Sequence, residues 1–191
     1  VYLLLGSIPI TENDKLFNRS ILINPDGDII SIYDKIHMFD ITLKNGESYK
    51  ESDFYSPGSE LKITKVLGHS VGHTICYDLR YPKLYRALAK KGSQIIVVPS
   101  AFTHTTGKAH WHSLIKARAI ENGVFILAPN QWGVNNEKRV TYGHTLIVDP
   151  WGETLAEAED GEMIIAAELD LNRVRDCQNA IPVLDNDRNF D

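Results

Sequence analysis

The stretch GHTICYDLRYP (residues 72–82) passes from apolar residues into a charged, turn-like segment. The apolar run 70–75 is typical of a β-strand, and residues 83–91 predict a helix. Cys76 therefore lies at the carboxyl end of a predicted strand, just before a helix. Backbone N–H groups are unpaired at such a junction and can hold a developing negative charge. The position suits a nucleophile, although a lone cysteine after a strand is more often a buried packing residue.

The segments on either side of this stretch predict an α/β protein with a mixed sheet and helices on one side of it. Pro25-Asp26-Gly27 is a hairpin signal between two strands, and residues 40–60 predict a long irregular loop. Gly92 and Gly123 are expected to end the two helices. The expected strands are 1–5, 20–24, 28–33, 61–66, 70–76, 95–98, 124–128, 145–148, 154–156 and 163–169, and the expected helices are 83–91 and 109–122.

Composition narrows the functional class. The chain has 191 residues, of which 43% are hydrophobic, and this is enough for one domain over residues 1–191. The net charge of −5 argues against nucleic acid or an anionic membrane as the main partner. No apolar run is long enough to span a bilayer, and no signal peptide is recognised. Two distant cysteines, Cys76 and Cys177, indicate neither a disulfide framework nor a zinc site, so we expect a cytoplasmic protein.

Two charged residues accompany Cys76. Lys35 follows a predicted strand and is flanked by Tyr33 and Ile36, where the strand gives way to a loop. Glu51 lies in the long loop that follows. Taken singly, a surface lysine and a solvated carboxylate are the ordinary interpretations of these two residues.

Five stretches together resemble the nitrilase superfamily of carbon–nitrogen hydrolases. They run through almost the whole chain in the family's order and with ordinary spacing. The segment NNEKRVTYGHTLIVDPWG (135–152) is most similar to the Nit branch, which contains deaminated-glutathione amidase and the ω-amidases. The resemblance implies an α-β-β-α sandwich whose helical faces pair between subunits, and hence at least a homodimer. The stretches are YDKIHMFD (33–40), GHTICYDLRYP (72–82), PSAFTHTTGKAHW (99–111), KARAIENG (116–123) and YGHTLIVDPWGE (142–153).

Carried onto this sequence, the resemblance implies that Cys76 is the nucleophile, Lys35 the catalytic lysine and Glu51 a supporting carboxylate. The thiolate attacks an amide carbonyl, and the Lys35 ammonium and the backbone N–H of Tyr77 stabilise the oxyanion. Ammonia or an amine leaves, and water hydrolyses the remaining thioester. The implied substrate is a small carboxylate-bearing amide, such as deaminated glutathione or an α-keto acid ω-amide. The mechanism requires no cofactor.

Three further positions match substrate-contacting sites of this branch. Arg80, four residues beyond Cys76, either clamps a substrate carboxylate through two hydrogen bonds or pairs with a local acid such as Asp78. Phe102 and Thr106 are expected to wall the pocket and to hydrogen-bond the substrate. For Phe102, a plain core aromatic remains the alternative.

The chain departs from the family in one respect. The family's general-base glutamate belongs to a strand–helix unit upstream of Lys35, but Glu12, the one glutamate before Lys35, lies in the polar segment 11–14 and does not match the motif. We therefore expect an N-terminally incomplete fold that lacks this first unit, and low activity from residues 1–191 alone. A nitrilase or an N-carbamoyl amide hydrolase remains an alternative within the enzymes. A catalytically dead remnant that acts as an oligomerisation module is the alternative outside them.

The histidines predict no metal site. His37, His110, His112 and His144 show no pair with ligand spacing and an acidic partner, and His110 and His112 point to different faces of the predicted helix. Each is interpreted as a hydrogen-bonded structural residue.

Overall fold

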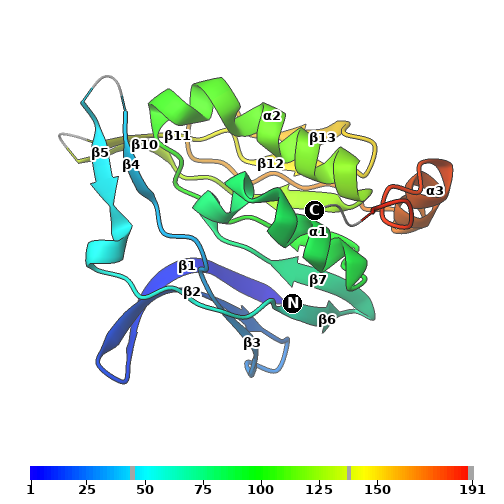
Figure 1. The fold of residues 1–191 in the computed structure, drawn as a ribbon, viewed down its shortest axis with the longest axis horizontal. Coiled ribbons are helices and arrows are strands. Elements are labelled where there is room, and N and C mark those ends of the chain that lie inside the picture. The colour runs from blue at the N-terminus through cyan, green and yellow to red at the C-terminus, as the bar shows by residue number, and fades with distance from the viewer. Residues whose placement is uncertain (44–45, 137–138, 189–191) are drawn as a thin grey trace.

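The computed structural model describes residues 1–43, 46–136 and 139–188. Two larger β-sheets form its centre (Figure 1). The first has the antiparallel order β1-β2-β3, and its strands are β1 (Leu3–Glu12), β2 (Lys15–Ile23) and β3 (Ile29–Asp34). The second has the order β13-β12-β9-β8-β7-β6, and its strands are β6 (Ile63–Val66), β7 (His69–His73), β8 (Ile95–Val97), β9 (Phe125–Ala128), β12 (Leu146–Val148) and β13 (Thr154–Glu157). Strands β7, β8 and β9 are parallel, whereas the flanking strands pair antiparallel.

Helices α1 (Pro82–Lys90) and α2 (His104–Asn122) cover one face of the six-stranded sheet (Figure 1). α1 has proline in its first turn, where no backbone donor is lost. α2 begins after Thr103, whose side chain accepts a hydrogen bond from the helix, and ends at Gly123 with φ of 59°. A third helix, α3 (Asn172–Ala180), lies to one side, and two short 3-10 helices are η1 (Glu51–Asp53) and η2 (Cys76–Arg80). No helix of the described residues is long and apolar enough to cross a membrane.

The main core lies between these helices and the sheet. Leu88 of α1 and Trp111 and Ile115 of α2 are fully buried against Ile96 and Ile126 of the central strands. Fully burying an aliphatic side chain of this size contributes about 1.5–3 kcal/mol. This cluster makes the six-stranded sheet a rigid base for the loops at its strand ends.

The two sheets face each other on the side away from α1 and α2. Leu4 and Gly6 of β1 line the same cavity as Val97 of β8 and Leu127 of β9. A Cβ atom on Gly6 would lie 2.5 Å from the Cβ of Pro99, so glycine permits the close approach of the sheets. The described residues therefore form three layers, α-β-β, of the predicted nitrilase-type sandwich.

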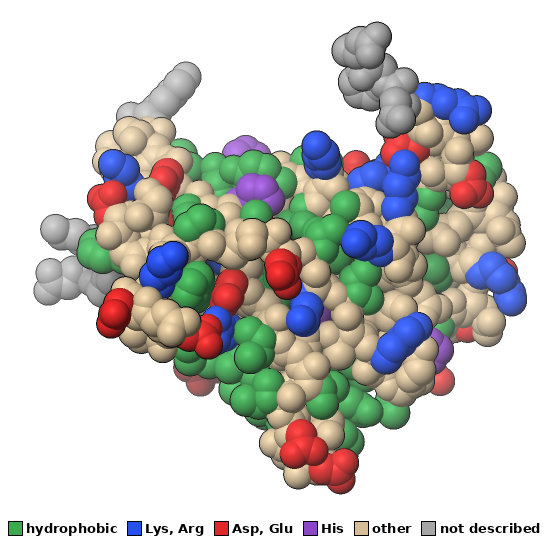
Figure 2. Space-filling model, turned by 60° about the horizontal axis from the view of Figure 1, so that its bottom comes forward, with side chains coloured by type: hydrophobic (Ala, Val, Ile, Leu, Met, Phe, Trp, Pro, Cys, Tyr) green, Lys and Arg blue, Asp and Glu red, His purple; other side chains and the backbone are tan. Residues whose placement is uncertain are grey.

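The outer face of β1-β2-β3 carries no helix among the described residues. Large apolar side chains are exposed on this sheet, and Figure 2 turns this side toward the viewer and shows hydrophobic side chains on the surface. These exposed residues are Leu3, Ile29, Ile30 and Ile32.

The strand–helix alternation around Cys76 and the two long helices are confirmed, whereas several other local predictions are wrong. β1 continues to Glu12, because Asn13 and Asp14 have φ of 50° and 59° and form a two-residue hairpin turn rather than a loop. The predicted loop 40–60 contains the hairpin of β4 (Asp40–Thr42) and β5 (Ser48–Lys50), with residues 44–45 outside the described part. Strands β10 (Trp132–Asn136) and β11 (Arg139–Tyr142) and helix α3 were not predicted, and 163–169 forms no strand.

Candidate active site

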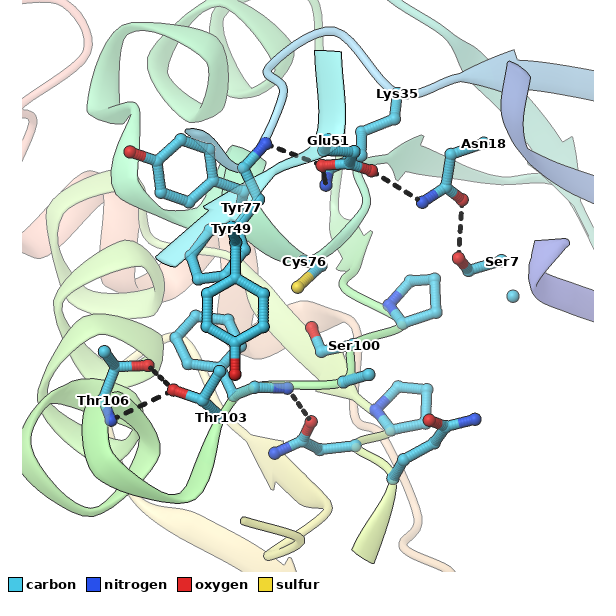
Figure 3. A pocket seen from close by; sticks show the side chains of 18 of the residues that line it. Ser7, Asn18, Lys35, Tyr49, Glu51, Cys76, Tyr77, Ser100, Thr103 and Thr106 are labelled. Carbon is cyan, nitrogen blue, oxygen red and sulfur yellow. Dashed lines mark hydrogen bonds and ion pairs between the residues drawn. The ribbon is translucent and has the colours of Figure 1, made fainter. Parts of the chain in front are cut away.

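Cys76 lies at a sharp turn between β7 and η2. Its φ is +48°, which costs a residue with a Cβ atom about 1–2 kcal/mol. Hydrogen bonds hold the turn on both sides: the Cys76 N–H donates to the Pro99 carbonyl at 3.0 Å, and the Ile75 N–H donates to the Asp78 carboxylate at 2.9 Å. Such strain persists only where the surroundings over-determine it, and it is common at functional sites. The turn directs the thiol into a pocket between the two sheets (Figure 3).

Asp78 anchors this turn and is fully buried. It accepts a hydrogen bond from the Tyr33 hydroxyl at 2.6 Å and contacts the His37 ring Nδ1 at 2.7 Å. Burial and the nearby Asp78 charge raise the pKa of Tyr33 above its ordinary range, so Tyr33 stays a hydrogen-bond donor. These bonds join the end of β3 to the turn at Cys76. They also occupy Asp78, and no ion pair joins Asp78 to Arg80 in the described residues.

Lys35 and Glu51 form a buried ion pair at one end of the pocket. Lys35 is 2% exposed, and its Nζ lies 2.5 Å from Glu51 Oε2. Glu51 is held in turn by the Phe39 N–H at 2.6 Å and the Asn18 Nδ2 at 3.2 Å. A buried pair of this kind is stable only when further hydrogen bonds satisfy it, as these do. Asn18, itself bonded to Ser7 at 2.6 Å, carried no signal in the sequence.

The pocket is a cavity of about 980 Å³. Its lining includes Cys76, Lys35 and Glu51 and the predicted residues Tyr77 and Phe102 (Figure 3). Thr106 also lines it, and the Thr106 hydroxyl lies 2.9 Å from that of Thr103. The structure thus brings five of the six other predicted site residues to the thiol's own cavity. Arg80 is the exception, because it is not among the lining residues.

Arg80 lies behind the pocket wall. Its guanidinium is 5.4 Å from the centre of the Phe102 ring, and its Nη1 is 3.3 Å from His110 Nδ1. Burial lowers the pKa of Arg80, and the described residues provide it with no carboxylate partner. The cation is therefore partly desolvated and unpaired, beside a ring that faces the cavity.

Arg139 is a pocket residue that the sequence analysis missed. It lines the cavity from β11, where its guanidinium lies 6.0 Å from the Tyr49 ring centre and donates to the Ala101 carbonyl at 3.2 Å. Its buried Nε has no hydrogen-bond partner among the described residues. Its sequence neighbourhood, Lys138-Arg139, indicated a cation, but the direction of the Arg139 side chain depends on the β10–β11 hairpin, which was not predicted.

Among the described residues that line the cavity, Glu51 is the one carboxylate. Glu12 does not line it and instead pairs with Arg19 at 2.7 Å. Arg19 also pairs with Asp34 at 2.7 Å. This agrees with the view that Glu12 belongs to the structure of the β1–β2 hairpin rather than to the site.

Comparisons with known proteins agree on one family. Residues 1–179 match the family described as carbon-nitrogen hydrolase. The chain is 40% identical to a deaminated glutathione amidase of Yersinia enterocolitica, covering 98% of this chain and 67% of that protein. It is 38% identical to the omega-amidase NIT2 of Xenopus tropicalis, covering 96% and 66%. The crystal structure of Saccharomyces cerevisiae Nit3, a member of branch 10 of the nitrilase superfamily, superposes with a TM-score of 0.85 at 36% identity, covering 95% and 64%. The chain thus spans about two thirds of the length of these relatives.

Proposed function

The chain belongs to the carbon–nitrogen hydrolase family, and on that premise we propose that it hydrolyses the amide bond of a small carboxylate-bearing amide. Deaminated glutathione and α-keto acid ω-amides are the substrates that the names of its relatives suggest. One observation carries the proposal: the Cys76 thiol opens into the same cavity as the buried Lys35–Glu51 pair. A nucleophile beside a fixed cation is what acyl transfer through a thioester requires.

The proposed reaction uses this arrangement of Cys76, Lys35 and Tyr77. The Cys76 sulfur bonds to the amide carbon, and the carbonyl electron pair moves to oxygen, where the Lys35 ammonium and the Tyr77 N–H stabilise it. The tetrahedral intermediate then collapses, the C–N bond breaks, and the amine leaves with a proton. Water attacks the thioester, which releases the acid and restores the thiol. Removing a positioned oxyanion donor typically costs about 10²–10³ in rate.

Glu51 acts through Lys35. Because Glu51 is held by Asn18 and by the Phe39 N–H, it presents a fixed negative charge to the ammonium. This fixes the direction of the Lys35 side chain in a place where an unpaired cation would be costly. The general base that removes the thiol proton is proposed to be a different glutamate, as the resemblance implies.

Two cations support recognition of a substrate carboxylate. Arg139 reaches the cavity directly, whereas Arg80 lies behind Phe102. Within residues 1–43, 46–136 and 139–188, Arg139 Nε has no hydrogen-bond partner and Arg80 has no acidic partner. The carboxylate clamp predicted for Arg80 remains a proposal that requires the Phe102 ring to shift. Arg139 needs no such movement. Replacing either arginine by an uncharged residue should raise KM for carboxylate-bearing amides and leave KM for neutral amides unchanged.

The test is ammonia release by the natural polypeptide from four substrates: an α-keto acid ω-amide, a neutral amide of the same length, a nitrile and an N-carbamoyl amine. We expect turnover of the first alone, its loss in Cys76→Ala, and full retention in the matched variant Cys177→Ala. Acid-quenched samples should carry the acyl mass on the peptide containing Cys76. Preference for the nitrile or the carbamoyl compound would favour those hydrolases instead. No turnover and no adduct with any substrate would favour the catalytically dead module.

We further propose one domain over residues 1–191 that pairs through its helical faces into a homodimer or a higher homo-oligomer, and a cytoplasmic location. The two free cysteines, Cys76 and Cys177, support a reducing compartment. Light scattering after size-exclusion chromatography tests the dimer, and fluorescence microscopy of a tagged copy tests the location.

A further inference from the structure

Outside the pocket, three potential metal ligands converge from three different elements. They are His112 of α2, His144 just before β12 and Glu157 at the end of β13, and Figure 1 shows these elements side by side. His112 Nε2 and His144 Nδ1 each lie 2.8 Å from the same oxygen, Glu157 Oε1. The spacing in the sequence indicated no histidine pair with an acidic partner, whereas in the structure His112 and His144 share Glu157. Only the pairing of β12 with β13 and the packing of α2 on this sheet bring the three together.

The surroundings fix the ring of His144. Its backbone has φ of +57°, and its carbonyl accepts a hydrogen bond from the Trp111 indole N–H at 2.7 Å. The Tyr142 ring stacks on the His144 ring at 4.4 Å between centres, 28° from parallel. Metal-binding histidines are oriented by such surrounding contacts. A residue with a Cβ atom adopts this backbone only at a cost, and Trp111 holds it there.

We propose that His112, His144 and Glu157 bind a divalent transition-metal ion of the Zn²⁺ class. Two imidazole nitrogens and one carboxylate oxygen, all within 4.8 Å of one another, form a donor set that suits Zn²⁺. A shallow hollow lined by His144, Glu157, Glu159 and Asp160 leaves room for water as a further ligand. Asp160 Oδ1 lies 4.0 Å from His144 Nε2, so a carboxylate also faces the second nitrogen of that ring.

Only a small rearrangement admits the ion. Zinc bonds of about 2.0–2.2 Å place tetrahedral ligand atoms about 3.3 Å apart, so the Glu157 oxygen must withdraw by roughly half an ångström. The Glu157 side chain is 35% exposed, and Glu157 is the last residue of the edge strand β13, so the side chain can move toward solvent. The ion replaces the two contacts to Glu157 Oε1. A ligating ring nitrogen carries no proton, so each ring passes the proton of its facing nitrogen to water and holds one proton on the nitrogen that faces away.

The site is structural, because none of its three ligands lines the cavity of Cys76. It ties α2 to the β12–β13 edge of the sheet. Thr106, which does line the cavity, lies six residues earlier on α2, about 9 Å along the helix axis. The ion would therefore stabilise the helix that forms one wall of the pocket. This inference stands independently of the proposed reaction.

Equilibrium dialysis of the chelator-treated natural protein against Zn²⁺ tests the site. We expect one tightly bound ion per chain, with affinity at least about 100-fold weaker in both His112→Gln and Glu157→Gln, since each removes a direct ligand. His104→Gln is the matched control, because His104 is an exposed histidine at the start of the same helix and pairs with no acidic residue in the part of the chain that the structure describes. Cys76→Ala should retain the ion, which places it away from the thiol.

Thermal unfolding with and without Zn²⁺ gives a second readout. Bound Zn²⁺ should raise the midpoint of the wild type, His104→Gln and Cys76→Ala but of neither ligand variant. The metal-free midpoints show whether each variant folds. Binding weaker than millimolar in the wild type overturns the proposal and leaves a hydrogen-bonded cluster. Zinc that is lost in Cys76→Ala and kept in the ligand variants overturns it equally.

Discussion

Replacing Cys76 by glycine should stabilise the protein relative to replacing it by alanine, which reverses the usual order of these two residues. Both substitutions remove the thiol, so the comparison isolates the backbone. Alanine at this φ of +48° has a Cβ atom in the left-handed region, whereas glycine has none. The hydrogen bonds of the turn involve backbone atoms of residue 76 and its neighbours, and both variants keep them.

The chain supplies its own reference position. Cys177 lies within α3, where glycine is about 1 kcal/mol less stable than alanine. Glycine's extra conformational freedom in the unfolded chain is common to both positions. It therefore cancels when the glycine-minus-alanine difference in unfolding free energy at residue 177 is subtracted from that at residue 76. What remains is the cost of the left-handed backbone, so the glycine-minus-alanine difference at residue 76 should exceed that at residue 177 by about 1–2 kcal/mol.

Urea unfolding of the four variants, Cys76→Gly, Cys76→Ala, Cys177→Gly and Cys177→Ala, measures this difference. Tryptophan fluorescence and far-ultraviolet circular dichroism should give coincident transitions with equal slopes. The free energy of unfolding of Cys76→Gly should equal or exceed that of Cys76→Ala. The free energy of unfolding of Cys177→Gly should be lower than that of Cys177→Ala. If alanine is favoured by the same margin at both positions, Cys76 is not strained, and the idea that the fold forces the thiol into the pocket at an energetic cost is refuted.

Three other changes test the site and its supports. Glu51→Gln leaves the Lys35 ammonium buried without its counter-charge. We therefore expect the free energy of unfolding in urea to fall by about 3–5 kcal/mol and ammonia release to slow at least about 100-fold. Turnover at the wild-type rate would contradict the positioning role of Glu51. Burial lowers the pKa of His73 from 6.5 to about 4, so as the pH falls below 6.5 the unfolded chain takes up the proton first. Stability should therefore fall by about 2 kcal/mol between about pH 8 and about pH 5, and a loss of the same size in His73→Gln would assign it to other groups. Gly107→Ala places a Cβ atom 2.3 Å from the Cβ of Tyr142, so α2 must move. We expect the free energy of unfolding to fall by about 1–3 kcal/mol and KM to rise. An unchanged KM would show that this contact does not affect the pocket.

The amino-acid sequence alone was enough to predict the turn at Cys76 and the central architecture. The apolar runs of β7, β8 and β9 and the helical periodicity of α1 and α2 are local patterns that tertiary contacts reinforce rather than override. Cys76 could be placed at a strand end for that reason. The positive φ there could not be predicted, because it depends on Asp78 and Pro99 holding the turn from outside.

The rest depended on contacts between distant residues. Lys35 meets Glu51 because the β4–β5 hairpin, read from the sequence as a loop, turns Glu51 back toward β3. Arg139 reaches the pocket because β10–β11 forms a hairpin that composition did not indicate. His112 and His144, 32 residues apart, share Glu157 only after the sheet edge forms. Local side-chain patterns specify which elements form, whereas the directions of charged side chains follow from strand register and loop geometry, and only the folded chain determines these.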